Sequence, residues 1–370
     1  MPDDPTTRIR QKKIKKAPFQ ALVMTDFSDL LLKWYDQHAR TLPWRAPMGV
    51  KPDPYHVWLS EIMLQQTTVA TVKAYFEKFR TLWPTVTALA AAPQEQVLKE
   101  WAGLGYYARA RNLHKCAGAV VADHAGTFPT TEPELIKLPG IGDYTAAAIA
   151  AIAFGEPAAV VDGNIERIIS RIYRIKTALP AAKKPIKLEV AKLTPHQRPG
   201  DFAQAMMDLG SSLCRPKNPS CTACPVNKHC EAARHGDMEF YPVKAPKKIK
   251  PTRRAVSFWL EHDGHVLLER RAEKGLLGGM PGFFSTPWIE RPELPQGNEY
   301  LPHAPSISNW QAIDGIARHT FTHFHLETRL VQATSHARAN IKGGFWHPLN
   351  ALQDIGLPTV FNKIAKLADR

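Results

Sequence analysis

The sequence predicts a multidomain protein in which an all-helical part is followed by a smaller α+β domain. Three observations support this prediction. From about Phe27 to Ile175, apolar residues recur every three or four positions, which is the spacing of amphipathic helices. Residues 236–254 are rich in proline and lysine, as is typical of an extended linker at a domain boundary. Beyond this linker, short apolar runs have the pattern of β-strands.

Length and charge limit the possible functions. The 370 residues are enough for two or three domains, and no run is long and apolar enough to cross a membrane. The formal net charge of +14 favours a polyanionic partner, although a merely basic soluble protein would share it. The first fifteen residues lack the apolar segment of a signal peptide. We therefore expect an intracellular, nucleoid-associated protein.

Four segments follow from this pattern. Residues 1–20 are predicted to form a basic disordered tail, which either adds a grip on DNA or is simply solvated. Residues 21–235 form the helical core, 236–254 the basic linker and 255–370 the α+β domain. In that last domain, Ala255–Leu260 and Val266–Arg270 are predicted strands joined by a hairpin at His262-Asp263-Gly264, and Phe321–Val331 is a further predicted strand.

The most informative feature is a group of four cysteines, Cys214, Cys221, Cys224 and Cys230. Thiolates this close in sequence can bind one inorganic centre. Structural zinc sites usually draw their ligands from two separated pairs, whereas only Cys221 and Cys224 form a close pair here. The spacing therefore favours a [4Fe–4S] cluster over zinc. Disulfides are a further alternative, but the fifth cysteine, Cys116, lies far away in an apolar helical stretch.

Two glycines and an aspartate mark the starts of two helices. Gly140 and Gly142 form a tight turn in L-P-G-I-G before an alanine-rich helix, whose first N–H groups can hold a phosphate. An ordinary turn between helices would have the same pattern. Asp162 lies in V-D-G-N just before an amphipathic helix, where backbone donors and the helix dipole favour its ionised form. Plain helix capping is the alternative role.

Glu61 is the second carboxylate of interest. At helical spacing its neighbours are Val57, Trp58 and Leu64, so we expect desolvation to raise its pKa. A raised pKa is what a general acid needs near neutral pH. The alternative is a partly buried helix residue paired with a lysine. One protonated and one ionised carboxyl group form the pair that breaks glycosidic bonds through an oxocarbenium-like transition state.

Together these motifs resemble the helix-hairpin-helix DNA glycosylase superfamily with its iron–sulfur cluster loop, and within it the adenine DNA glycosylases of the MutY type. The resemblance extends from about Leu42 to the end of the chain. It is carried by L-P-W-R at 42–45, W-L-S-E-I-M-L-Q-Q-T at 58–67, G-L-G-Y-Y-A-R-A-R-N-L-H at 103–114, L-P-G-I-G-D-Y-T-A at 138–146, V-D-G-N at 161–164 and the four cysteines. It implies a helix-hairpin-helix glycosylase core with a [4Fe–4S] cluster loop.

The resemblance implies a monomeric enzyme that removes adenine mispaired with 8-oxoguanine, or with guanine, from double-stranded DNA after flipping the nucleotide out. It implies that Glu61 protonates the adenine, that Asp162 stabilises the positive sugar and that Tyr144 assists. Bifunctional relatives such as endonuclease III carry a lysine at the position of Tyr144, which attacks the sugar and leads to strand cleavage. A phenol cannot form that Schiff base, so we expect a monofunctional enzyme.

Other site residues follow from the same resemblance. Gln66 and Tyr106 would fill or wedge the base stack near the lesion, although a core position is the alternative for Tyr106. Arg45 and Gln204 would line the adenine pocket. The cysteine loop would contact the phosphate backbone through its basic residues, Arg215, Lys217 and Lys228.

The last domain resembles the Nudix-like domain of adenine glycosylases at residues 275–281 and 318–326. No run of closely spaced glutamates, which a Nudix hydrolase needs to hold magnesium, follows Ala255, so we expect a recognition module. Phe321, Thr322 and His323 would lie on a loop that inspects 8-oxoguanine. The family usually has Phe-Ser-His there, and Thr322 keeps the hydroxyl group but adds a methyl group. Metal ligation and ordinary surface positions are the alternatives for the nearby histidines, His319, His323 and His325.

Three other functions are weighed against this one. A glycosylase for thymine or uracil opposite guanine is disfavoured by the recognition domain. A non-catalytic iron–sulfur DNA-binding or redox-signalling protein has no need of an acid such as Glu61. A stand-alone Nudix-type nucleotide hydrolase is disfavoured by the missing acidic motif.

Overall fold

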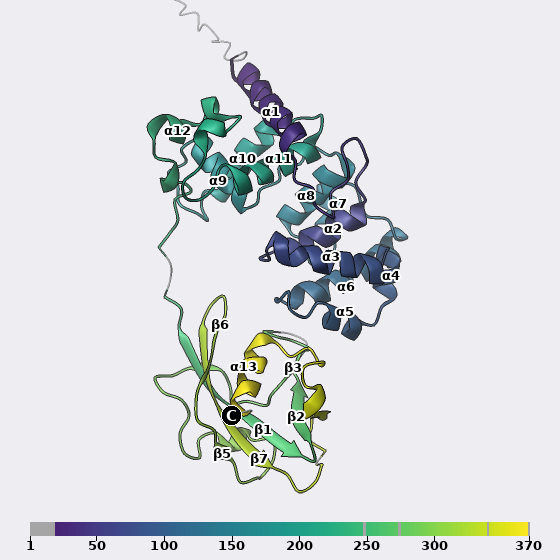
Figure 1. The fold of residues 1–370 in the computed structure, drawn as a ribbon, viewed down its shortest axis with the longest axis vertical. Helices are drawn as coiled ribbons and strands as arrows, with labels where there is room; N and C mark the ends of the chain where they lie inside the picture. The colour runs from purple at the N-terminus through teal and green to yellow at the C-terminus, as the bar shows by residue number, and fades with distance from the viewer. Residues whose placement is uncertain (1–18, 247–248, 273–274, 339, 369–370) are drawn as a thin grey trace, which may run out of the picture. The chain divides into compact units, whose positions relative to one another are not determined.

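The computed structural model describes residues 19–246, 249–272, 275–338 and 340–368 (Figure 1). The chain forms two compact units: one contains residues up to 58, 129–137 and 141–245, and the other contains 59–128, 138–140 and the residues from 246 onward. The helical core predicted for 21–235 is thus divided between two units. None of the described helices is long and apolar enough to span a membrane.

The first unit is helical. Its elements are α1 (Phe19–His38), the start of α2 (Pro54–Leu64), α7 (Glu132–Leu135), α8 (Asp143–Phe154), α9 (Gly163–Ile172), α10 (Lys183–Leu193), α11 (Pro199–Ser212) and α12 (Glu231–His235), with the 3-10 turns η1 (Cys221–Ala223), η2 (Asn227–His229) and η3 (Met238–Phe240). Alanines dominate α8, which is buried on nearly all sides. This allows α11 to approach closely: a Cβ atom on Gly200 would lie 2.6 Å from the carbonyl oxygen of Ala151. Only glycine fits at this helix crossing.

The part of the second unit that precedes the sheet is helical and contains the end of α2, α3 (Val69–Leu82), α4 (Val86–Ala91), α5 (Gln94–Glu100) and α6 (Ala108–His124). Threonines begin two of them, because Thr68 Oγ1 accepts the N–H of Thr71 at 3.3 Å and Thr85 Oγ1 that of Ala88 at 3.1 Å. Aromatic rings fill the space between the helices, and Phe79 and Trp101 are fully buried there.

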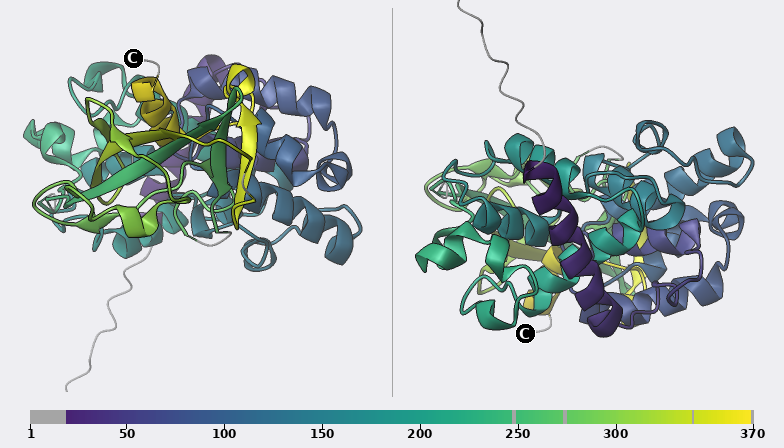
Figure 2. Two further views of the ribbon diagram at one scale, coloured as in Figure 1. Left: turned by 90° about the horizontal axis from the view of Figure 1, so that it is seen from below. Right: turned by 90° about the horizontal axis from the view of Figure 1, so that it is seen from above.

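The same unit includes a sheet with strand order β3-β2-β1-β7-β5. Its elements are β1 (Thr252–His262), β2 (His265–Arg270), β3 (Pro281–Gly282), β4 (Ile289–Glu290), η4 (Leu301–His303), β5 (Gln311–Ala312), β6 (Ala317–Thr320), β7 (His325–Thr334), β8 (Gly344–Pro348), η5 (Leu349–Ala351) and α13 (Thr359–Ala368). The long strands β1 and β7 are parallel, from Thr252 opposite His325 to Glu261 opposite Thr334, and Figure 2 shows them side by side. Helix α13 buries Phe361 and Ile364 against one sheet face.

The structure confirms the hairpin between the first two strands. Asp263 and Gly264 both have positive φ angles, 42° and 69°, as a two-residue hairpin turn with the twist of its strands requires. The predicted strand at Phe321–Val331 is partly wrong, because β7 begins only at His325. Residues 321–324 form the turn after β6 instead.

The linker predicted for residues 236–254 is shorter than expected. The 3-10 turn η3 lies within it, and β1 already begins at Thr252. Arg253 and Arg254 therefore belong to the sheet: Arg254 Nε binds Glu327 Oε2 at 3.0 Å, and the Arg253 guanidinium lies 4.4 Å from the Phe324 ring centre. The first residues of β1 thus have long basic side chains. A search for alternating apolar residues therefore misses the start of this strand. Of the predicted tail, residues 1–18 lie outside the described residues and Phe19 begins α1.

Candidate active site and cysteine loop

Asp162 is the N-cap of α9. Its Oδ1 accepts the backbone N–H of Ile165 at 2.8 Å, and its Oδ2 accepts Asn164 Nδ2 at 2.8 Å. Asp162 thus lies at the start of a helix, as the sequence predicts. The prediction that this position favours the ionised form of Asp162 is wrong. Burial raises the pKa of Asp162 above its ordinary value, because desolvation outweighs the opposing hydrogen bonds from Ile165 and Asn164 and the charge of Arg167. The carboxylate is thus held firmly in an environment that disfavours its charge.

A chain of hydrogen bonds connects Asp162 to the cysteine loop. Asn164 accepts a bond at its Oδ1 from Arg167 Nη2 at 2.9 Å, while Arg167 Nε donates to the carbonyl oxygen of Cys214 at 2.8 Å. The Arg167 guanidinium also binds the carbonyl oxygen of Gly210 at 2.7 Å. A Cβ atom on Gly210 would lie 2.5 Å from that of Asn164, so this contact requires glycine. The orientation of Asp162 therefore depends on the start of the cysteine loop.

The four cysteines line a single small cavity. Its volume is about 30 Å³, and apolar side chains of α9 and α11, such as Ile168 and Leu209, complete the walls. Burial raises the pKa of Cys221 and Cys230, and raises that of Cys224 to about 12. These thiols stay protonated near neutral pH unless a cationic centre replaces their protons. Four sulfur donors at one cavity nevertheless fit a thiolate-bound metal centre.

Arg171 is a second arginine at this cavity, and it is only 1% exposed. Its Nη1 lies 3.3 Å from Cys214 Sγ and donates to the carbonyl oxygen of Arg215 at 2.8 Å, while Nη2 donates to that of Pro216 at 3.0 Å. The guanidinium places positive charge beside a thiol and shapes the loop that follows it. Within the described ranges, no three His, Cys, Asp or Glu side chains form a group that could hold a metal ion.

The basic residues of the loop differ in their surroundings. Lys217 is exposed, and Arg215 Nη2 donates to the carbonyl oxygen of Asn218 at 3.0 Å. Lys228 lies 2.6 Å from Asp26 Oδ2 in α1, so its charge is partly neutralised. Of the three basic residues, Lys217 is therefore the most available for a contact with phosphate.

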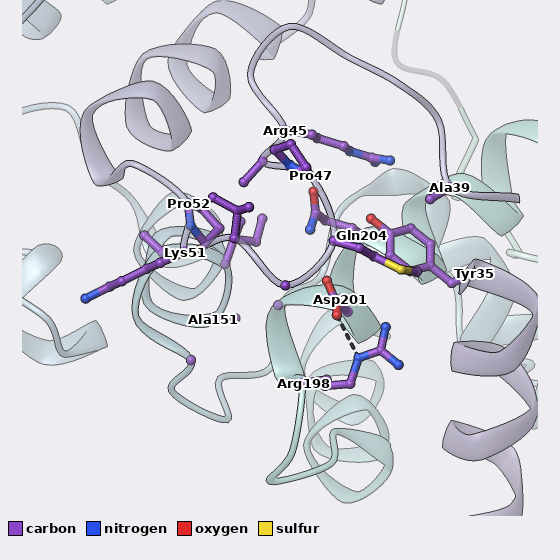
Figure 3. A pocket seen from close by; sticks show the side chains of 18 of the residues that line it. Tyr35, Ala39, Arg45, Pro47, Lys51, Pro52, Ala151, Arg198, Asp201 and Gln204 are labelled. Carbon is purple, nitrogen blue, oxygen red and sulfur yellow. Dashed lines mark hydrogen bonds and ion pairs between the residues drawn. The ribbon is translucent and has the colours of Figure 1, made fainter. Parts of the chain in front are cut away.

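A pocket of about 780 Å³ lies in the first unit, between the loop at 40–52, the end of α8 and the start of α11 (Figure 3). Arg45 and Gln204 both line it, and their assignment to an adenine pocket stays a prediction. In Figure 3 the amide group of Gln204 points into the space beside Pro47. The Arg45 guanidinium turns toward Asp208, with Nη1–Oδ2 and Nη2–Oδ1 distances of 2.7 and 2.8 Å. Neither Tyr144 nor Asp162 is among the residues that line this pocket.

The hairpin before α8 has the predicted turn. Gly140 has a φ of 77°, and a Cβ atom there would lie 2.6 Å from that of Asn112. Gly142 is the exposed N-cap of α8, so the first N–H groups of the helix are accessible. Tyr144 lies in the first turn of α8 and is partly buried.

Glu61 lies in α2 and belongs to the second unit, whereas Asp162 belongs to the first. Its side chain is almost fully buried, with 6% exposed, next to the buried Val57 and Trp58. This is the apolar environment predicted from helical spacing. The pKa of Glu61 stays a prediction.

Gln66 and Tyr106 occupy two loop tips of the second unit. Both are exposed and have left-handed φ angles, 56° and 48°. Tyr106 is 53% exposed, so the alternative of a core aromatic is wrong. One buried arginine, Arg109, contacts both loops.

The turn between β6 and β7 separates the three predicted lesion-reading residues. Thr322 and His323 are exposed, whereas Phe321 is partly buried, with its ring centre 5.7 Å from that of Trp288 and 4.8 Å from that of Phe324. Phe321 therefore anchors the turn, and Lys250 Nζ holds it by donating to the Phe321 carbonyl oxygen at 3.0 Å. The metal alternative for the three histidines finds no support among the described residues.

Sequence reasoning gave no role to five residues that shape these sites: Asn164, Arg167, Arg171, Asp208 and Arg109. Asn164 was part of the V-D-G-N motif, so the motif itself contained the signal. Arg167 and Arg171 are four residues apart in α9 and thus share a face, which was a readable sign of a polar surface on this helix. Asp208 and Arg109 have partners distant in the sequence, so no local pattern identifies them.

Comparisons with known proteins identify the two domain families. Residues 59–196 match the family described as HhH-GPD superfamily base excision DNA repair protein, and residues 255–367 match the NUDIX domain family. The fold is also similar to a thermostable thymine-DNA glycosylase, with a TM-score of 0.53 and 29% identity over 59% of this chain and all of that one. The fold and site thus define a base-excision DNA glycosylase with an appended Nudix-like domain.

Sequence relatives specify the family further. The adenine DNA glycosylase of Buchnera aphidicola subsp. Schizaphis graminum is 33% identical over 355 residues, which cover 92% of this chain and 98% of that protein. The human adenine DNA glycosylase is 36% identical over 323 residues, which cover 73% of this chain and 59% of the human protein. The chain belongs to the adenine DNA glycosylase family.

Proposed function

We propose that this DNA glycosylase excises adenine opposite 8-oxoguanine, or opposite guanine, in duplex DNA, and that it does so without cutting the strand. The observation that carries the proposal is the fixed carboxylate of Asp162 at the N-cap of α9, which accepts bonds from Ile165 and Asn164. A carboxylate held in place and partly desolvated stabilises a positive charge that develops beside it.

In the proposed reaction, Glu61 donates its proton to a ring nitrogen of the flipped adenine. The N-glycosidic bond then breaks, its electron pair leaves with the neutral base, and a positive charge remains on the sugar. Asp162 stabilises this cation until water adds to the sugar carbon and loses a proton. The burial of Glu61 beside Val57 and Trp58 supports its role, because it places the carboxyl group in an apolar environment. Tyr144 assists from the first turn of α8 and supplies no amine for strand cleavage.

The cysteine loop is proposed to hold a [4Fe–4S] cluster through Cys214, Cys221, Cys224 and Cys230. The four thiolates would hold the cluster, and they would not have to meet at a single metal ion as zinc ligands do. The apolar cavity that the four cysteines share supports this assignment. When bound, the cluster supplies positive iron centres that keep the thiols deprotonated.

DNA contacts are proposed at three further places. The N–H groups at the start of α8, beside Gly140 and Gly142, are suited to a phosphate. Gln66 and Tyr106 are exposed for insertion into the base stack. Thr322 and His323 are proposed to inspect the oxidised base opposite adenine, while Arg45 and Gln204 are assigned to the adenine side. We further propose that the enzyme acts as a monomer.

The test is a set of matched duplexes carrying adenine opposite 8-oxoguanine, adenine opposite guanine, thymine opposite guanine and uracil opposite guanine. Alkali should reveal abasic sites in the first two only. The strand should stay intact before alkali, and borohydride should trap no covalent adduct in a reaction where endonuclease III, as control, is trapped. Release of thymine or uracil, or a substantial adduct, would overturn the proposal.

A further inference from the structure

Two exposed residues of the second unit have backbone conformations that residues other than glycine rarely adopt. Gln66 follows the end of α2, and Tyr106 precedes α6. Both are in the left-handed region, which costs about 1–2 kcal/mol for a residue with a Cβ atom. Such conformations persist only where surrounding contacts hold them.

A single side chain supplies contacts to both loops. Arg109, near the start of α6, donates from Nη1 to the carbonyl oxygens of Ile62 and Met63 at 3.0 and 2.9 Å. Its Nη2 donates to Thr67 Oγ1 at 3.1 Å and to the carbonyl oxygens of Leu104 and Gly105 at 2.9 and 3.2 Å. One edge of the guanidinium therefore binds the end of α2, and the other binds the residues flanking Gln66 and Tyr106.

The aromatic surroundings of Arg109 strengthen this connection. Its guanidinium carbon lies 5.2 Å from the Trp101 ring centre and 5.7 Å from that of Tyr106. Trp101 Nε1 in turn donates to the carbonyl oxygen of Gly105 at 3.0 Å. The charge is also well placed to bind carbonyl oxygens at a helix C-terminus, where the helix dipole is negative.

We propose that Arg109 is a positioning residue that fixes Gln66 and Tyr106 as one rigid unit for entry into the base stack. The inference rests on the proposed DNA contacts of these two residues. If the two loops are already rigid, DNA binding does not have to order them and loses less conformational entropy. More of the binding free energy is then available for unstacking the target base. Lysine cannot replace Arg109, because a point-like ammonium lacks the planar fork that reaches both loops.

The first test needs no DNA. Arg109→Lys is the variant to use because it keeps the buried charge, and Arg111→Lys is its control because Arg111 lies in the same helix and is equally buried, with 9% exposed. Hydrogen exchange should become roughly tenfold faster at residues 64–68 and at 103–107 in Arg109→Lys. It should not change there in Arg111→Lys. Unchanged exchange in both segments, or equal acceleration in the two variants, would overturn the inference.

The second test measures unstacking directly. With 2-aminopurine next to the target adenine, binding of the wild-type protein should raise the fluorescence, and Arg109→Lys should reduce the rate of that rise by about tenfold. The effect should largely vanish in a Tyr106→Ala background, because the two residues act together. Additive effects of the two substitutions would contradict the inference.

These readouts also separate this inference from the proposed function. A wild-type protein that releases no adenine from any duplex contradicts the proposed function, while the exchange experiment still decides the role of Arg109. A wild-type protein that releases adenine normally, with Arg109→Lys indistinguishable from Arg111→Lys in exchange and fluorescence, rejects only the role of Arg109.

Discussion

Arg45 and Asp208 form a two-pronged ion pair between residues 163 positions apart, with N–O distances of 2.7 and 2.8 Å. The Asp208 side chain is 2% exposed and that of Arg45 10% exposed, so both charges are largely removed from water. Arg40 adds two further bonds, since its backbone N–H donates to Asp208 Oδ2 at 3.1 Å and its Nε donates to Asp208 Oδ1 at 2.5 Å. One carboxylate thus fastens the loop at 40–52 to α11, and these two elements form walls of the pocket.

Asp208→Asn is expected to destabilise the fold strongly. The substitution leaves the guanidinium of Arg45 buried without a counter-charge, and breaking a buried pair in this way costs roughly 3–5 kcal/mol. Asp201→Asn is the control, because Asp201 pairs with Arg198 at 2.8 Å where both side chains are well exposed, and the loss there should be below about 1 kcal/mol. Chemical denaturation of both variants measures the difference. An equal decrease in the free energy of unfolding for both variants would show that the Arg45–Asp208 pair stabilises the fold no more than an exposed ion pair does.

Glu61→Gln is expected to slow adenine release by at least about a hundredfold, the usual minimum contribution of a general acid. The amide keeps the shape of the buried side chain but has no proton to transfer to the base. Single-turnover rates on duplexes with adenine opposite 8-oxoguanine provide the measurement, and Glu77→Gln on the exposed face of α3 is the control. Wild-type rates for Glu61→Gln would disprove the acid mechanism, provided that the control is also unchanged.

Asp162→Asn is expected to abolish activity, and its stability relative to the wild type should be greatest near neutral pH. Asparagine can still accept the Ile165 N–H, but its NH2 group cannot accept the bond from Asn164 Nδ2, while the substitution removes a carboxylate whose charged form burial disfavours. Because folding raises the pKa of Asp162, the wild-type penalty is full at neutral pH and shrinks as the pH falls through the raised value towards 3.8. The stability of the variant relative to the wild type should therefore decrease as the pH falls from neutral towards 3.8. A difference that grew on acidification would have the wrong sign.

His323→Ala is expected to weaken discrimination between 8-oxoguanine and guanine opposite adenine. Loss of one hydrogen bond to the oxidised base should reduce the ratio of the two rates by roughly tenfold. His336→Ala is the matched control, because His336 is an exposed histidine just beyond the other end of β7. An unchanged ratio for His323→Ala would argue against the β6–β7 turn as the lesion reader.

Cys224→Ser is expected to lose bound iron and acid-labile sulfide, which should be present in equal amounts in the wild-type protein. Cys116→Ser should keep both, since Cys116 is buried in α6 of the second unit whereas the cysteine loop belongs to the first. Metal analysis of the purified proteins gives the answer directly. Zinc in place of iron, or equal iron loss in the two variants, would contradict the cluster assignment.

The sequence was most informative where neighbouring residues determine structure. The helix cap at Asp162, the turn at Gly140 and the hairpin at Asp263-Gly264 depend on local backbone geometry and were predicted from short motifs. The apolar surroundings of Glu61 likewise followed from helical spacing.

Contacts between distant segments could not be predicted in this way. Arg109 binds Thr67, 42 residues away, in addition to its local partners, and the Asp208 carboxylate binds Arg45, 163 residues away, so only the folded chain brings these groups together. The pKa shift of Asp162 also depends on how closely distant segments pack around it, which reversed the expected direction. Local motifs identify which groups can act, while tertiary packing decides their charge and orientation.

The close approach of Gly200 to α8 also affects Tyr144, which lies at the other end of that helix. Helix α8 is a single rod of 12 residues, with Tyr144 in its first turn and Ala151 against Gly200. A methyl group at Gly200 would push backbone against backbone, where nothing can yield by changing a rotamer. Because α8 is one continuous helix, a shift at Ala151 would also displace Tyr144. The absence of a side chain at Gly200 therefore fixes both the distance between α8 and α11 and the position of the Tyr144 phenol.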